Sequence, residues 1–356
     1  MSKKYQSLFI LLASMAICLS SCNGDKQSHE IANIKLTGSV VTASDDYIIG
    51  YNGHLFNDSL IEMSRIGDNL CNVSIFMADS LLQADGFGRR GAGPNELLDG
   101  YLGKSPSGDY VIIDSPSGIN SKIYSVPADN LHNHSEWQHI NVDTLSIMTS
   151  AFVVLDDSCL LMSSAPYGSE KSIFTIINYR TGACYPTDFW PEDGYSGPAY
   201  PKLYIYTANA KLQASGDGRF VYSPLYGDYA FIFSLEGKHV NVLYTLANNP
   251  IEYTVQDALN PKINHKPYLS EMSSNGKHIY RFHYNKKDDG TLSESILDTR
   301  GGNDVDVYDW DGNLVKQYTL DRLGHLIMVN GADTDLYLLA TNPESGANEW
   351  VRYEIE

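Results

Sequence analysis

Two segments of this chain carry side chains that could bind a ligand. In the first, Arg89 and Arg90 lie within the glycine-rich stretch GFGRRGAGPNELL (residues 86–98). Guanidinium groups and backbone N–H groups in such a loop could together bind an anion. In an acidic protein, however, arginines commonly pair with neighbouring carboxylates, and this structural role is the competing interpretation.

The second segment is the aromatic stretch DFWPEDGYSGPAYPKLYIY (residues 188–206). Its rings, among them Trp190, Tyr195 and Tyr200, could stack on sugars or clasp a peptide. Compact loops also bury their own side chains, so a self-packed loop that caps the core is the alternative interpretation.

No catalytic motif is present in the sequence. The glycines at positions 86, 88 and 91 have the GxGxxG spacing of a dinucleotide-binding loop, but Gly93 and Pro94 follow at once, which argues against the helix that such a site requires. Motifs of the GxSxG, HExxH and P-loop types are absent. The sequence therefore predicts no catalytic residue and no cofactor.

Two clusters resemble metal sites only in part. Three histidines in LHNHSEWQH, His132, His134 and His139, could ligate a transition metal, but no carboxylate is placed by spacing, and an exposed polar strand explains them better. The aspartates around Asp309 echo a calcium loop without its distal glutamate, and a hairpin turn at Asp311 accounts for them. We predict no metal site.

The N-terminus begins MSKKYQSLFILLASMAICLSSC, with two lysines ahead of an apolar run over residues 8–19. The run is too short to cross a bilayer comfortably and has the pattern of a secretory signal. The residues LSSC that end it resemble a bacterial lipobox; an ordinary signal peptide cut nearby is the alternative. We predict a lipoprotein signal peptide over 1–21, a lipid on Cys22 that anchors the chain to the membrane, and a flexible tether over 22–30.

Composition limits the partners. The chain has 43 acidic and 25 basic side chains and a formal net charge of −18 at pH 7, which argues against nucleic acid and against electrostatic binding to anionic lipid. Beyond Cys22 the cysteines are Cys71, Cys159 and Cys184, without zinc-like spacing, so at least one is unpaired and disulfides are not the basis of stability.

An internal repeat dominates the rest of the chain. Six segments join a polar turn to a β-branched or aromatic strand, at intervals of 48 to 63 residues: DDYIIGY, GDYVIID, DDSCLLMSS, GDGRFVYSP, SNGKHIYRF and TDLYLLAT. The first five are each followed by a pattern that predicts a β-hairpin, such as YAFIFSLEGKHVNVLY. A further strand such as AKLQAS makes four per repeat, and only IEYTVQDAL (residues 251–259) is expected to form a helical turn.

These repeats predict an all-β fold, a six-bladed β-propeller over residues 31–356 with four-stranded antiparallel blades. The sixth repeat lacks its outer strand, because only EWVRYEIE follows TDLYLLAT after a short turn. The N-terminal stretch IANIKLTGS is placed to supply that strand and close the last blade. We therefore expect a strand within residues 31–41 to pair with EWVRYEIE, which would remove the open edges.

The lipobox and the blade-like repeats together resemble the TolB-like six-bladed β-propeller lipoproteins of Bacteroides-type bacteria. The most specific element of the resemblance is the glycine-rich segment over residues 86–98, with its Gly-Pro-x-Glu sequence. That family has no established biochemical activity. The resemblance therefore implies a fold and an anchor, but no catalytic residues.

Strand counting predicts the face on which a ligand binds. Four strands of alternating direction place the tight turns on one face and the long connections, residues 51–70, 89–98, 188–206, 248–270 and 283–303, on the other. Long loops on a rigid scaffold commonly carry recognition. The candidate contacts on that face are Arg89, Arg90, Glu96, Trp190, Tyr195, Tyr200, Tyr268 and Arg300.

The sequence thus predicts a non-catalytic ligand-binding or scaffolding module of the cell envelope, an outer-membrane lipoprotein with a glycan, a peptide or an envelope protein as ligand. The alternative is a propeller enzyme, such as a metal-dependent lactonase or lyase, whose site is scattered over several blades. A single acidic residue near the anchor, Asp25, leaves the periplasmic and the surface orientation both open.

Overall fold

A computed structural model describes residues 31–43, 47, 50, 52–56, 58–91, 93, 96–114, 121–142, 151–164, 171–207, 210–225, 228–248, 253–257, 260–263, 270–284, 302–342 and 344–355. The chain divides into two compact units, Met1–Ala32 and Asn33–Glu356. The predicted signal peptide, Cys22 and the tether lie outside the described residues, as do Tyr268 and Arg300. Among the described residues, no helix is long and apolar enough to cross a membrane.

The unit Asn33–Glu356 is built from β-sheets, three of which are separate, four-stranded and antiparallel. The first contains β7 (Gly100–Lys104), β8 (Tyr110–Asp114), β9 (Ser121–Val126) and β10 (Gln138–Val142). The second contains β11 (Phe152–Val154), β12 (Cys159–Met162), β13 (Thr175–Asn178) and β14 (Cys184–Pro186). The third contains β15 (Lys211–Ala214), β16 (Arg219–Ser223), β17 (Tyr229–Glu236) and β18 (His239–Asn248).

The other long strands join into one twelve-stranded sheet. Its path runs through β21 (Ser270–Ser274), β22 (His278–Tyr284), β23 (Gly302–Asp309), β24 (Leu314–Val329), β25 (Asp335–Thr341), β26 (Asn348–Glu354), β2 (Ser39–Ala43), β6 (Ser80–Arg89), β5 (Asn69–Met77), β4 (Ser59–Met63) and β3 (Asn52–Phe56). The long strand β24 belongs to two groups, because its early part pairs with β23 and its last part, from Gly324, pairs with β25. The path stays open at β21 and β3.

The N-terminal strands pair with strands from both ends of the unit's sequence. Strand β2 pairs antiparallel with β26, with Val41 opposite Trp350, and continues as a parallel neighbour of β6. Both Val41 and Trp350 are buried. Strand β1 (Asn33–Leu36) pairs in parallel with the early part of β24. The pairing expected between a strand within residues 31–41 and EWVRYEIE is therefore present, through Ser39, Val40 and Val41. The strand expected in IANIKLTGS, however, is β1, which pairs with β24 instead.

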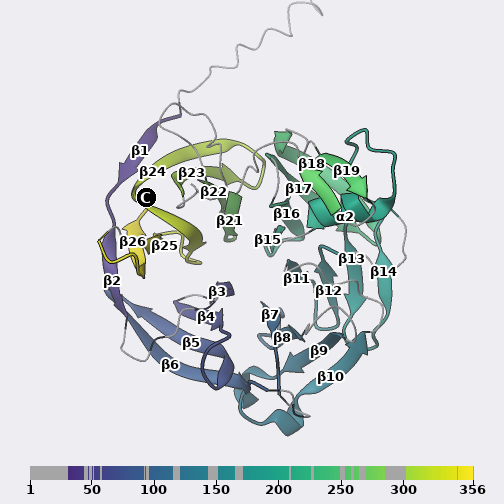
Figure 1. Ribbon diagram of the computed structural model, residues 1–356. Helices are drawn as coiled ribbons and strands as arrows, with labels where there is room; N and C mark the ends of the chain where they lie inside the picture. The colour runs from purple at the N-terminus through teal and green to yellow at the C-terminus, as the bar shows by residue number, and fades with distance from the viewer. Residues whose placement is uncertain are drawn as a thin grey trace, which may run out of the picture. The chain divides into compact units, whose positions relative to one another are not determined.

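Strands from distant parts of the sequence contact one another in cyclic order. Strand β3 contacts β7, β7 contacts β11, β11 contacts β15, β15 contacts β21, β21 contacts β24, and β24 contacts β3. In Figure 1, β3, β7, β11, β15 and β21 lie at the centre of the unit, and the later strands of their sheets lie further out. The all-β class and the four-stranded antiparallel sheets predicted from the sequence are confirmed.

The apolar runs that mark the repeats form the second strands of these groups. In β8, the side chains of Val111, Ile112 and Ile113 are all fully buried. They point alternately to the two faces of the sheet, and both faces are covered by neighbouring sheets, so the run is continuous rather than alternating. This packing explains why the second strands were the clearest signal in the sequence.

The tight turns lie together, as strand counting predicted. Arg219, which follows the turn between β15 and β16, donates to Asp311 in the turn between β23 and β24, at 3.1 Å. Arg180, in the turn between β13 and β14, donates to the carbonyl of Asp157, in the turn between β11 and β12, at 3.0 Å. Turns between the first and second strands of a sheet and turns between the third and fourth strands were expected on the same face, and these two contacts join one turn of each kind.

The first repeat was assigned wrongly. Of DDYIIGY, the described residues Tyr47 and Gly50 are not in a strand, and the second strand of this group is β4, just after Asp58. The connection expected over residues 51–70 therefore contains β3 and β4. The charged Glu62 concealed this strand, because it interrupts the apolar run although it is buried.

The expected helical turn was also wrong. Residues 251–259 contain β19 (Tyr253–Asp257), which pairs with β20 (Asn260–Ile263), and the tyrosine, threonine and valine there favour a strand. The helix α2 (Ala199–Thr207) lies instead in the aromatic segment. Its Pro201 is in the first turn, where no amide hydrogen is needed. In LHNHSEWQH (residues 131–139), where a polar strand was expected, the 3₁₀ turn η2 (His134–Glu136) forms instead, and only the last two residues belong to a strand, β10; a second 3₁₀ turn, η1 (Ala128–Asn130), precedes the segment.

Candidate ligand-binding site

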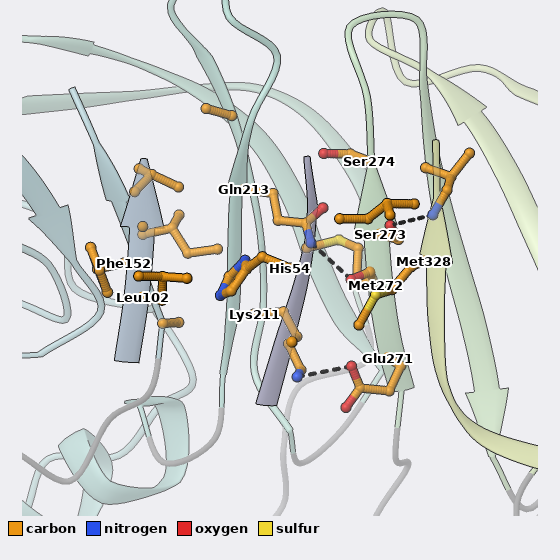
Figure 2. A pocket seen from close by; sticks show the side chains of 18 of the residues that line it. His54, Leu102, Phe152, Lys211, Gln213, Glu271, Met272, Ser273, Ser274 and Met328 are labelled. Atoms are coloured by element: carbon orange, nitrogen blue, oxygen red, sulfur yellow. Dashed lines mark hydrogen bonds and ion pairs between the residues drawn. The ribbon is translucent and has the colours of Figure 1, made fainter. Parts of the chain in front are cut away.

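A cavity of about 300 Å³ lies between β3, β7, β11, β15, β21 and the last part of β24, which all contribute to its lining. We call it the central cavity. Figure 2 shows several of its polar side chains, among them His54 from β3, Lys211 and Gln213 from β15, and Glu271 from β21. Residues from four different strands also form its apolar walls: Leu102, Phe152, Met272 and Met328.

Two contacts join β15 to β21 across the wall of this cavity. The Lys211 Nζ and Glu271 Oε2 atoms are 2.8 Å apart, with 28% and 14% of the two side chains exposed. Gln213 Nε2 donates to the carbonyl of Met272 at 3.0 Å. Because side chains alternate along a strand, the sequence KLQA places Lys211 and Gln213 on the same side of β15.

The other polar atom of the Gln213 side chain is its amide oxygen, Oε1. This atom is buried and accepts no hydrogen bond from the described part of the chain. A buried acceptor in this state is costly unless water or a ligand supplies a donor. Gln213 lines the central cavity, so a donor that reaches its Oε1 atom from there would be stabilised.

His54 is neutral at physiological pH. Burial, with a smaller contribution from the positive charge of Lys211, lowers its pKa from 6.5 to about 4. Its ring stacks on that of Phe56, with centroids 5.9 Å apart. Lys104, the last residue of β7, is an exposed cation that lies over the Phe56 ring, with its Nζ atom 5.2 Å from the ring centroid.

These groups can bind a ligand but do not form a metal centre. Among the described residues, no group of three or more histidine, cysteine, aspartate or glutamate side chains could hold a metal ion. The carboxylate that the described lining of the central cavity supplies is Glu271, which pairs with Lys211. The scattered metal ligands expected of a lactonase-like enzyme are not found in the described lining.

The glycine-rich segment is held by its own charges. Arg89 Nε lies 3.3 Å from Glu96 Oε1, and Glu96 Oε2 accepts from the Gly93 amide at 2.8 Å. Gly91 has a φ of 153°, and a Cβ added there would meet the Glu96 carboxylate. Strand β6 runs through Gly86 and Gly88 to Arg89, so the GxGxxG spacing does not open a helix. The structural interpretation of Arg89 is therefore the one that its contacts support.

Arg90 has a different setting from Arg89. Its Nη1 donates to the carbonyl of Gly67 at 3.0 Å, whereas its Nε is buried without a partner in the described residues. Arg90 lines a cavity of about 250 Å³ together with Asp68 and Leu97.

The aromatic segment packs largely on itself. Lys202 Nζ and Asp193 Oδ1 are 2.5 Å apart, and both side chains are almost fully buried. Burial acts to raise the pKa of Asp193, but hydrogen bonds from Lys202, the Tyr195 amide and Tyr253 hold it below its usual range. The Trp190 ring lies over Lys202 Nζ at 4.9 Å. This buried ion pair fixes the loop as a cap on the core.

Three rings of the same segment, those of Trp190, Tyr195 and Tyr200, are partly rather than fully buried. Tyr195 packs on Tyr253, with ring centroids 5.2 Å apart, and Tyr200 is half-buried in α2. Trp190 lines a cavity of about 530 Å³ with Phe189, Tyr206 and other residues.

The predicted contacts therefore fall into separate places. Arg89 and Glu96 are brought together, but Arg90 and Trp190 line different cavities, on connections that follow β6 and β14. Their role in ligand binding stays a prediction. The polar residues of the central cavity, His54, Lys211, Gln213 and Glu271, were missed. The alternation of lysine and glutamine in AKLQAS, a strand the sequence did predict, was the available signal.

No protein-family model matches the sequence, and no curated protein matches it. Among solved structures, the chain is similar to a gluconolactonase from Xanthomonas campestris, with 10% identity and a TM-score of 0.43 over 83% of this chain and 82% of that one. It is also similar to the β-propeller domain of the Trilobed protease from Pyrococcus furiosus, with 11% identity and a TM-score of 0.39 over 90% and 83%. A protein of unknown function from Bacteroides thetaiotaomicron has 11% identity and a TM-score of 0.42 over 90% and 76%. At these values, none of these proteins' functions extends to this chain.

Proposed function

We propose that this chain is a six-bladed β-propeller lipoprotein of the cell envelope that binds a small polar ligand in its central cavity without catalysing a reaction. The cyclic contacts among β3, β7, β11, β15, β21 and β24 support six blades. The pairing of β2 with β26 supports closure of the last blade by the N-terminal strand.

The observation that carries the binding function is the convergence of Lys211, Gln213, Glu271 and His54 on one cavity of about 300 Å³. Ligand sites are concave and mostly apolar, with a few placed polar groups, and this volume is at the lower end of their range. Because the polar groups come from three separate blades, a ligand would bind to a preformed scaffold rather than to a mobile loop. A small glycan or a short peptide has the required chemistry, and an envelope protein could present either.

The anchor belongs to the same proposal. The LSSC sequence at the end of the apolar run supports lipidation of Cys22, and with it placement as an outer-membrane lipoprotein. Metabolic labelling with a fatty-acid probe tests it. The native chain should incorporate the label and fractionate with membranes, and Cys22→Ala should lose both; unchanged labelling of the variant would contradict the assignment.

The binding function is tested by a thermal-shift screen of the purified chain against small glycans, short peptides and divalent metals. Ala214 ends β15 and lines the central cavity, so Ala214→Trp should fill part of it and abolish any stabilisation by a cavity ligand. Ala347, exposed in the turn between β25 and β26, provides the matched control Ala347→Trp, which should respond like the native chain.

Two outcomes would count against the proposal. Ligands whose effect survives Ala214→Trp would place the site elsewhere, with the loop residues Arg89, Trp190 and Tyr195 the next to be replaced by alanine. Stabilisation by a divalent metal alone would favour the enzyme alternative.

A further inference from the structure

Two of the three charged side chains in the described lining of the central cavity cancel each other. Lys211 and Glu271 form a close ion pair, and His54 carries no charge at neutral pH. Lys104 also belongs to the lining, but it is exposed and rests on the rings of Phe56 and Tyr110, so water screens its charge. A ligand with a net charge would therefore enter without a free counter-ion, and an uncompensated charge in a partly buried site is unfavourable.

The hydrogen-bonding groups require a ligand that donates. Gln213 Oε1 is a buried acceptor without a partner among the described residues, and the second oxygen of Glu271 can accept as well. Hydroxyl groups meet this need and can also accept from Lys211 Nζ without adding charge. The walls formed by Leu102, Phe152, Met272 and Met328 can pack against C–H groups.

We infer that the central cavity binds a neutral, hydroxyl-rich molecule of monosaccharide size, an inference that rests on the proposed function. The cavity of about 300 Å³ accommodates one sugar ring rather than a chain. Lys211 and Glu271 bind neighbouring hydroxyls as donor and acceptor, Gln213 Oε1 accepts from a third, and the ring face lies against the apolar wall. Neutrality is the property that distinguishes this ligand class from amino acids, carboxylates and amines.

Matched sugars test the inference directly. Glucose, galactose and mannose are each compared with their 2-amino and 6-carboxylate derivatives, which keep the ring and add one positive or one negative charge. Binding to the purified chain is measured by titration calorimetry at slightly acidic pH, where the amino group is protonated. We expect at least one neutral sugar to bind, and to bind about tenfold more tightly than either of its charged derivatives.

Single substitutions in the ion pair should reverse this preference. Glu271→Gln leaves Lys211 without its partner and should make the carboxylate derivative the tightest ligand. Lys211→Met leaves Glu271 unpaired and should favour the amino derivative. The double variant Lys211→Met/Glu271→Gln should again prefer the neutral sugar, and Lys104→Met, an exposed cation of the same lining, should leave the preference within about threefold of native.

The outcomes separate this inference from the function on which it rests. A charged derivative that binds the native chain more tightly than the neutral sugar would overturn it. So would a screen in which peptides or other ligands, but no sugar, show an effect that Ala214→Trp abolishes; in that case the cavity still binds a ligand. If no ligand shows an effect sensitive to Ala214→Trp, the proposed function itself fails. Melting temperatures of all variants establish that they are folded.

Discussion

Glu62 should make the stability of this protein fall as pH rises. Its side chain is 1% exposed in β4. The Tyr47 hydroxyl donates to Oε2 at 2.7 Å and the Gly50 amide donates to Oε1 at 3.2 Å. Trp350 Nε1 in turn donates to the Tyr47 oxygen at 2.6 Å. Burial raises the pKa of Glu62 from 4.5 to about 7, and the two hydrogen bonds only partly oppose this rise.

The sign and the size of this pH dependence follow from the proton that Glu62 binds in the folded chain. Between pH 4.5 and about 7 the folded chain holds a proton on Glu62 that the unfolded chain has released. The free energy of unfolding therefore decreases as pH rises through this window, by about 3 kcal/mol in all. This contribution to stability is fully present below the unfolded pKa and is lost above the folded one.

The measurement is urea unfolding of the native chain and of Glu62→Gln at several values between about pH 5 and pH 8. The difference between their free energies of unfolding should fall by roughly 3 kcal/mol with rising pH, since contributions from other groups cancel in the difference. Glu344→Gln replaces an exposed carboxylate and serves as the control, with a nearly constant difference. If the difference for Glu62→Gln changes by less than about 1 kcal/mol, the burial argument is refuted.

Three further predictions concern stability. In the unfolded chain His54 becomes protonated below pH 6.5, whereas in the folded chain it becomes protonated only near pH 4. The free energy of unfolding should therefore fall as pH drops from 6.5 to about 4. His54→Gln should lack that fall in urea unfolding, and an unchanged slope would contradict the pKa. Lys202→Met leaves the buried Asp193 carboxylate unpaired and should cost about 3–5 kcal/mol in the same assay. Arg65→Met, which breaks a largely exposed pair, should cost about 1 kcal/mol or less, and equal losses would show that burial is not decisive. A chain beginning at Val41 loses β1 and most of the pairing between β2 and β26, so it should melt well below a chain beginning at residue 31; equal melting temperatures would contradict this.

Much of the fold could be predicted because it depends on local patterns. The second strands are buried on both faces, so they appear in the sequence as continuous apolar runs such as YVIID. Gly237 and Gly312 adopt a positive φ, which glycine favours, so these residues predict tight turns. The pairing of the N-terminal strand with β26 followed from counting strands. The first repeat failed where this logic breaks down, because the buried charge of Glu62 interrupts β4.

By itself the sequence determined the strand pattern, the sheet class and the acidic character that argues against nucleic acid. Only the tertiary structure decided the candidate site. Lys211 and Glu271 are sixty residues apart and become an ion pair because the first strands of two sheets lie side by side. The same packing holds His54 neutral and leaves Gln213 Oε1 without a donor among the residues that the structure describes. Such effects depend on burial and on distances between strands from separate repeats, and neither quantity is encoded in a local pattern of residues.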